Sequence, residues 1–146
     1  KEAVVADQKL REIRGLKLFS ECRAEDVRWI AGVADTVDVP AGRTIVREGE
    51  RVREFVMLVR GVASASNGHE PVALAPGSHV GELGLCDDDT HQQTVEATTP
   101  VRLLVFGPGA FRGMLTRIPS VGRALLAPKV ERLDRPQEPR SLRAVS

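Results

Sequence analysis

Residues 39–49 read Val-Pro-Ala-Gly-Arg-Thr-Ile-Val-Arg-Glu-Gly, and this stretch decides how the rest of the chain is interpreted. A short run with β-branched residues, Thr44–Arg47, lies between the turn Pro40-Ala41-Gly42 and the turn residue Gly49. Short runs of this kind that are bounded by glycine and proline are typical of strands. The stretch therefore predicts a β structure built from short strands and tight turns.

The same pattern extends over residues 35–106. The dipeptide Asn67-Gly68 predicts a hairpin, because it accepts a positive φ at both central positions of a type I′ turn. Regular short strands with glycine-bearing turns favour a sandwich or a barrel. Besides Thr44–Arg47, the predicted strands are Thr36–Val39, Glu54–Val59, Val62–Ser66, Pro71–Ala75, Thr94–Ala97 and Arg102–Phe106.

Helical periodicity flanks this β region on both sides. Apolar residues at spacings of three and four predict amphipathic helices. Gly107-Pro108-Gly109 is expected to break the chain, and Pro119 suits the first position of a helix. The predicted helices are Lys9–Leu18, Ala24–Ala34, Ala110–Arg117 and a last one from Pro119 through Leu126, which Pro128 interrupts or restarts as a short piece to Leu133.

The order of these elements predicts an α+β domain with helices packed at one end of a β structure. We expect one domain over residues 1–134, with helices in 9–34, the β unit in 35–106 and C-terminal helices in 110–134. Residues 135–146 are rich in Pro, Arg and Ser and are expected to form a disordered tail.

Composition excludes several classes of function. The net charge of +1 gives no broad cationic field for nucleic acid, and 3% aromatic residues give no platform for stacking bases. No apolar run approaches the roughly 20 residues that span a bilayer, and no signal peptide is visible. Two separate cysteines, Cys22 and Cys86, suit a reducing compartment, so a cytoplasmic location is expected.

Five glycines, Gly42, Gly49, Gly61, Gly77 and Gly81, follow one another at the expected corners of the β unit, where a side chain would obstruct the turn. With the segments Gly15–Ser20, Phe55–Gly61 and Arg102–Val105, this ordered set resembles the cyclic nucleotide-binding domain of catabolite activator proteins, protein kinase A regulatory subunits and gated channels. The resemblance covers Leu10 to Leu133. It implies a double-stranded β-helix, a jelly-roll-like β-roll, flanked by N- and C-terminal helices.

The resemblance also implies a ligand site. The loop Val80–Cys86 is similar to the phosphate-binding cassette of the family, which would bind cAMP or cGMP. Gly81 would let the backbone approach the ligand, and Glu82 would accept a hydrogen bond from the ribose 2′-hydroxyl. After Leu83, the backbone N–H groups near Gly84 and Leu85 would point at the cyclic phosphate, because the start of a helical turn is an anion site.

The cassette departs from the family pattern at its end. Counting from Gly81 without a gap, His91 occupies the position of the arginine that grips the phosphate, and Gln92 and Gln93 occupy positions where small residues are usual. Asp87-Asp88-Asp89 precedes them and is expected to be a solvated loop rather than a metal site. Two interpretations stay open: His91 is a weaker, pH-sensitive phosphate contact in a domain that binds the nucleotide weakly, or the pocket serves another ligand or a protein partner.

The expected function is regulation of a fused or partner effector, with residues 121–133 as the helix that closes over the ligand and a homodimer as one possible assembly. No catalytic residue and no cofactor is expected, and His69, His79 and Ser78 are expected at the surface. A helix-turn-helix after Asp134 does not fit in the remaining residues, so DNA binding by this segment is not expected. Iron ligation by Cys86 and His91 in a haem sensor is a third alternative.

Overall fold

Strands β3 (Phe55–Arg60) and β8 (Val101–Phe106) form the antiparallel centre of the structure. The computed structural model describes residues 2–82 and 89–125. In this part of the chain the strands form two four-stranded sheets, with the orders β1-β8-β3-β6 and β2-β7-β4-β5. The other strands are β1 (Asp35–Val39), β2 (Thr44–Val46), β4 (Ala63–Ser66), β5 (Val72–Leu74), β6 (His79–Val80) and β7 (Thr94–Ala97).

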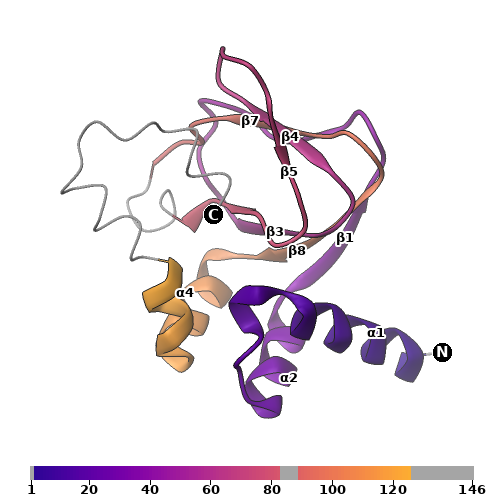
Figure 1. Ribbon diagram of the computed structural model, residues 1–146. Helices are drawn as coiled ribbons and strands as arrows, with labels where there is room; N and C mark the ends of the chain where they lie inside the picture. The colour runs from indigo at the N-terminus through magenta and orange to yellow at the C-terminus, as the bar shows by residue number, and fades with distance from the viewer. Residues whose placement is uncertain (1, 83–88, 126–146) are drawn as a thin grey trace.

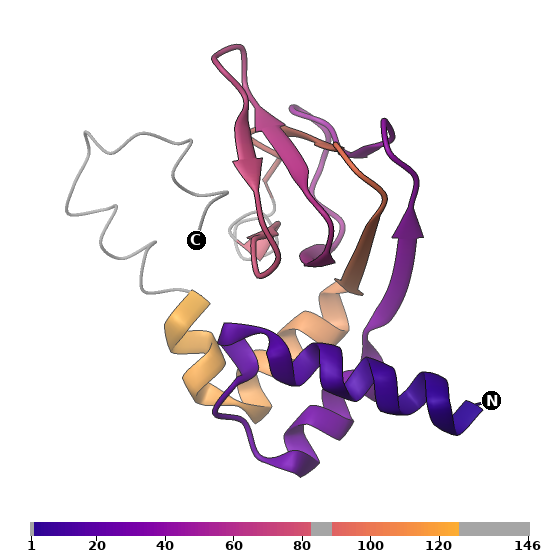
Figure 2. The same ribbon diagram turned by 45° about the vertical axis from the view of Figure 1, so that its right-hand side comes forward.

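The helices gather at one end of the β-roll that the two sheets make (Figures 1 and 2). They are α1 (Glu2–Gly15), the short 3₁₀ helix η1 (Lys17–Phe19), α2 (Ala24–Val33), α4 (Pro108–Arg117) and the helical residues 119–125. This arrangement confirms the predicted α+β fold, a β-roll flanked by helices. None of the helices in the described residues is long and apolar enough to cross a membrane.

Four local predictions need correction. The first helix starts at Glu2, before the predicted Lys9, and ends at Gly15. The break between the last strand and the next helix lies at Gly107 alone, and α4 starts at Pro108 rather than at the predicted Ala110, because proline lacks an N–H that the first helical turn would leave unbonded anyway. Strand β6 was not predicted, since two residues carry no periodicity. The Asn67-Gly68 hairpin forms between β4 and β5, but its loop spans residues 67–71 and is longer than a two-residue turn.

Both faces of the β3–β8 ladder are buried, each in a different core. Phe55 and Met57 point toward the helices and join a core with residues of α1, α2 and α4. Their neighbours Val56 and Leu58 point the other way, into the interior of the roll. Because successive side chains of a strand alternate between faces, the run Phe-Val-Met-Leu serves both cores at once.

The five corner glycines have φ values between 87° and 102°. The prediction that a side chain would obstruct each corner is confirmed at Gly61 and Gly81, whereas a Cβ on Gly42, Gly49 or Gly77 would have no atom within 4 Å, so these three are favoured by their positive φ alone. A Cβ on Gly61 would overlap the carbonyl oxygen of Pro100 and lie 2.9 Å from both Thr99 Oγ1 and Val101 Cγ1. A Cβ on Gly81 would overlap the carbonyl oxygen of Glu54. These two glycines therefore combine a left-handed backbone with a tight approach between segments.

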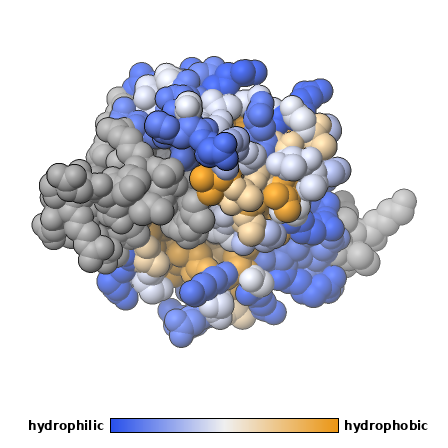
Figure 3. Space-filling model, turned by 45° about the horizontal axis from the view of Figure 1, so that its top comes forward, coloured by the Kyte–Doolittle hydropathy of each residue, from blue (hydrophilic) through white to orange (hydrophobic). Residues whose placement is uncertain are grey.

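Most apolar side chains are covered. Figure 3 shows a face of the molecule that is largely hydrophilic, with a smaller hydrophobic area in its middle. Among the described residues, Val37 and Val62 are the exposed large hydrophobic side chains. The predicted helical end at 126–134 and the predicted tail at 135–146 lie outside the described residues.

The contacts at Gly61 lead to a stability prediction with an internal control. Gly61→Ala and Gly42→Ala both place a side chain at a positive φ, which costs about 1–2 kcal/mol. Gly42 faces open space, whereas Gly61 is packed against residues 99–101, so Gly61→Ala should lose about 1–3 kcal/mol more. Urea unfolding of both variants measures the difference, and equal losses would contradict the packing role of Gly61.

Candidate functional site

The chain leaves β6 through Gly81, which has a φ of 102°. Strand β6 pairs with β3, with Val56 opposite Val80 and Met57 opposite His79. At Gly81 the backbone passes directly over the residue that precedes β3, since the site of a Cβ is filled by the Glu54 carbonyl oxygen and lies 3.3 Å from Phe55 Cα. Gly81 thus fixes the position of the backbone from which the Glu82 side chain extends.

Glu82 is buried beside a histidine. Its side chain is held by His79, whose Nδ1 lies 3.2 Å from Glu82 Oε2, and the two residues are 9% and 6% exposed. The His79 ring also packs against Phe55, with 5.5 Å between the ring centroids. Glu82 is therefore placed and oriented by β6 and β3, both of which belong to the rigid sheet.

The expectation that Ser78 and His79 lie at the surface is wrong, because both are buried. Pairing of β6 with β3 places His79 opposite Met57, inside the structure. The sequence signal for this was weak: a histidine and a glutamate three residues apart on either side of a glycine. His69 is exposed, as expected.

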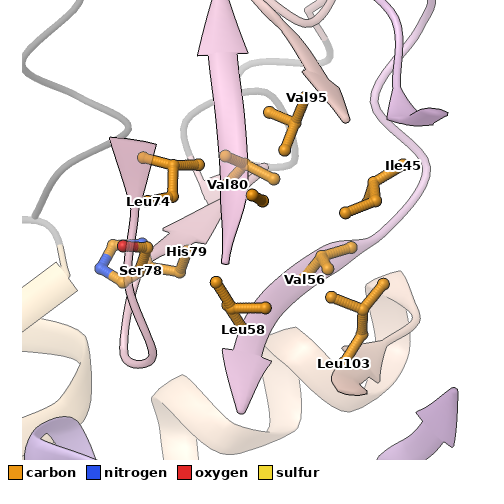
Figure 4. Close-up of a pocket in the computed structure, with 10 residues that line it drawn as sticks. Ile45, Val56, Leu58, Leu74, Ser78, His79, Val80, Val95 and Leu103 are labelled. Carbon is orange, nitrogen blue, oxygen red and sulfur yellow. The ribbon is translucent and has the colours of Figure 1, made fainter. Parts of the chain in front are cut away.

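An apolar pocket lies inside the roll, and its lining comes from both sheets. Figure 4 shows Val56 and Leu58 of β3, Leu103 of β8 and Val95 of β7 converging on it, with Ser78 and His79 at one side. Its other lining residues are Ile45, Ala63, Leu74 and Val80. The pocket is a continuation of the hydrophobic core, and its polar groups come from the segment that leads to Glu82.

The middle of the predicted cassette, Leu83, Gly84 and Leu85, lies outside the described residues, as do Cys86, Asp87 and Asp88. Beyond that gap, Gln93 is buried, and the Gln92 side-chain amide donates to the Thr90 carbonyl oxygen at 3.2 Å. No group of His, Cys, Asp and Glu in residues 2–82 and 89–125 could hold a metal ion.

His91 lies in a second cavity, a charged cleft of about 380 Å³. Burial lowers the pKa of the His91 imidazole, and the nearby Glu50 carboxylate opposes this shift. The imidazole is therefore neutral at pH 7. The cleft is lined by Ile45, Val46, Arg47, Glu50, Arg51, Arg53, Glu54, Val56 and His91.

The structure thus divides the predicted residues between two adjoining places. Glu82 lies at the end of β6, while His91 lies in the charged cleft, and Ile45 and Val56 line both cavities. Sequence reasoning missed the three arginines of this cleft. The sequence pattern that could have indicated them is Arg51-Val52-Arg53, in which two arginines flank an apolar residue. In the structure Val52 is buried.

Comparison with known proteins agrees with this architecture. The family model described as "Cyclic nucleotide-binding domain" matches residues 36–117. The cAMP-dependent protein kinase regulatory subunit of Emericella nidulans is 32% identical over 109 residues, which is 73% of this chain and 26% of that protein. This chain therefore spans about a quarter of the length of that relative.

Two solved structures share the fold. PKAR CBD2 with bound Sp-2Cl-cAMPS aligns with a TM-score of 0.73 and 19% identity, over 89% of this chain and 90% of that one. The catabolite activator protein of Thermus thermophilus aligns with a TM-score of 0.69 and 22% identity, over 81% and 58%. Because the family model matches more than half of the chain, this protein belongs to the cyclic nucleotide-binding domain family.

Proposed function

We propose that this domain is a regulatory module that binds cAMP or cGMP and controls an effector that is fused to it or associates with it. The observation that carries the proposal is the placement of Glu82: its carboxylate is buried and held by His79, and it directly follows Gly81, whose positive φ and close backbone contact allow no other residue. The similar protein from Emericella nidulans is named a cAMP-dependent protein kinase regulatory subunit, and two solved structures with the same fold contain cAMP or an analogue of it.

The parts of a cyclic nucleotide have matching places in this scheme. The apolar lining of the roll suits the non-polar face of the ligand, and Glu82 accepts a hydrogen bond from the ribose hydroxyl. His79 holds the Glu82 carboxylate in position through their 3.2 Å contact. The backbone of residues 83–85 and the side chains of His91, Gln92 and Gln93 complete the proposed phosphate end of the site.

The proposed module comprises residues 1–134, with residues 121–133 as the helix that closes over the ligand and 135–146 as a tail. Ligand binding would favour the closed position of that helix and so report occupancy to the effector. In this scheme the module has no catalytic step and no cofactor, and it operates in the cytoplasm. Homodimerisation would be one way to couple two such modules.

Replacing the Glu82 carboxylate tests the ribose contact. Glu82→Gln keeps the shape of the side chain but removes the charged acceptor, so the affinity for cAMP and cGMP should fall by about tenfold or more. Glu96→Gln, an exposed carboxylate on β7, is the control and should bind like the parent. Isothermal titration calorimetry measures both. If the parent binds neither nucleotide, the function proposed here fails and another ligand must be sought.

Restoring the cationic group at position 91 tests the phosphate end. His91→Arg adds a guanidinium where the family carries one, and the new charge-assisted contact should raise the affinity for cAMP by about tenfold. The expected gain is measured by the same calorimetry at pH 7.5. His69→Arg, which adds the same charge at an exposed position, should give no gain. An unchanged affinity in His91→Arg would remove position 91 from the site.

The lowered pKa of His91 predicts a pH dependence of stability. Near pH 6 the unfolded chain binds a proton at His91 more readily than the folded chain does, so the free energy of unfolding should rise with pH. This stability is present above the ordinary histidine pKa of about 6.5 and is lost as the pH falls below it. His91→Gln should flatten this dependence between pH 5.5 and 7.5 in urea unfolding. Parallel curves for the parent and His91→Gln would contradict burial of a neutral imidazole.

A further inference from the structure

The charged cleft contains arginines although the family's phosphate arginine is missing from it. Three guanidiniums line the cleft, those of Arg47, Arg51 and Arg53, against the two carboxylates of Glu50 and Glu54. His91 adds no charge at pH 7, because burial lowers its pKa. The positive charge of the cleft therefore comes from the loop between β2 and β3.

This loop is held in place by backbone hydrogen bonds to the segment that ends the cassette. Gly49 N–H donates to the His91 carbonyl oxygen at 2.9 Å, and His91 N–H donates to the Glu50 carbonyl oxygen at 2.8 Å. Val52 N–H donates to the Asp89 carbonyl oxygen at 3.0 Å. These hydrogen bonds fix the backbone of the loop relative to position 91, where the family has its phosphate-binding arginine.

Val52 is buried and only 7% exposed. Arg51 and Arg53, on either side of it, are exposed, and both line the cleft, which Val52 does not. Arg53 therefore lies along the cleft together with Arg47 from the end of β2. In residues 2–82 and 89–125, neither Arg47 nor Arg53 forms an ion pair with a carboxylate.

The cleft adjoins the apolar pocket. Ile45 and Val56 line both cavities, so a ligand with an anionic end and a non-polar body can place one in each. A free inorganic anion would use only the charged part. The arrangement favours a phosphate that belongs to a larger, partly apolar molecule, which is the chemistry of a nucleotide.

We propose that Arg47 and Arg53 bind the phosphate of the cyclic nucleotide in this cleft and replace the arginine that position 91 lacks. This inference rests on the proposed function for the identity of the ligand, but the cleft itself is independent of Glu82. Guanidiniums form paired, charge-assisted hydrogen bonds with phosphate oxygens, and two of them can grip one phosphate from two sides.

The first experiment measures cAMP affinity by calorimetry in 50 mM salt. Arg47→Gln and Arg53→Gln should each weaken binding by about three- to tenfold, and the double variant by about tenfold to a hundredfold. Arg28→Gln removes the same charge from an exposed position on α2 that does not line the cleft, and it should leave the affinity unchanged. If the parent binds cAMP and the double variant binds it equally well, the arginine role is overturned while the proposed function stands.

A variant with the opposite effect excludes a merely structural explanation. Glu50→Gln removes a carboxylate from the cleft but keeps the backbone carbonyl that accepts from His91 N–H. Because a negative charge near the phosphate disfavours binding, this variant should bind cAMP about two- to fivefold more tightly at the same salt concentration. Weaker binding would show that Glu50 contacts the ligand favourably, and this outcome would overturn the proposed charge balance.

Inorganic phosphate separates failure of the inference from failure of the proposed function. Titration of the ¹⁵N-labelled protein should shift the amide signals of residues 47–53 and the Nε–Hε signals of Arg47 and Arg53, with no shift in the double variant. Shifts with phosphate but no binding of cAMP or cGMP would support the anion site and refute the nucleotide. Absence of shifts with phosphate and with cAMP would overturn both proposals.

Discussion

The antiparallel ladder between β3 and β8 is the constraint on which the rest of the structure depends. Its register pairs Phe55 with Phe106 and Leu58 with Leu103, so each strand sends alternate side chains to the helical core and to the roll. A slip by one residue would exchange the two sets of side chains. Strand β3 also pairs with β6, and the backbone at Gly81 packs against Glu54 and Phe55 at the start of β3. The position of Glu82, the next residue, therefore depends on this ladder.

A charged network on the rim of the ladder joins the first helix to it. Arg102 of β8 donates to Asp38 of β1 at 2.8 Å and to Glu12 of α1 at 3.2 Å, and Arg60 of β3 reaches the same Glu12 at 3.1 Å. The hydrogen bond from Arg102 lowers the pKa of the Asp38 carboxyl, so the pair stays charged to a lower pH. The helices and the candidate site are thus attached to the same two strands, which is the connection that the proposed regulatory role requires.

The sequence allowed the fold to be predicted because local signals agreed. Glycines at corners, β-branched runs and amphipathic helices each carry their own pattern, and none of them depends on a distant partner. The site was only partly predictable. The Gly81-Glu82 pair has a local signature, but the burial of His79 depends on pairing with β3, and the arginine cleft depends on the bridge between Arg51 and Thr90. Contacts between segments some twenty to forty residues apart leave no local pattern.

The difference between a buried and an exposed cation gives a physical reason for the proposed phosphate site to lie on the loop rather than at position 91. A half-buried cation at position 91 loses part of its hydration in the empty domain and must be compensated there by a negative charge such as the Glu50 carboxylate. A neutral histidine avoids this cost. Arg47 and Arg53 are exposed, so they stay hydrated without ligand and are partly screened by salt. A site built on them has a more stable empty state but weaker binding, and its affinity depends more on ionic strength than that of a buried guanidinium.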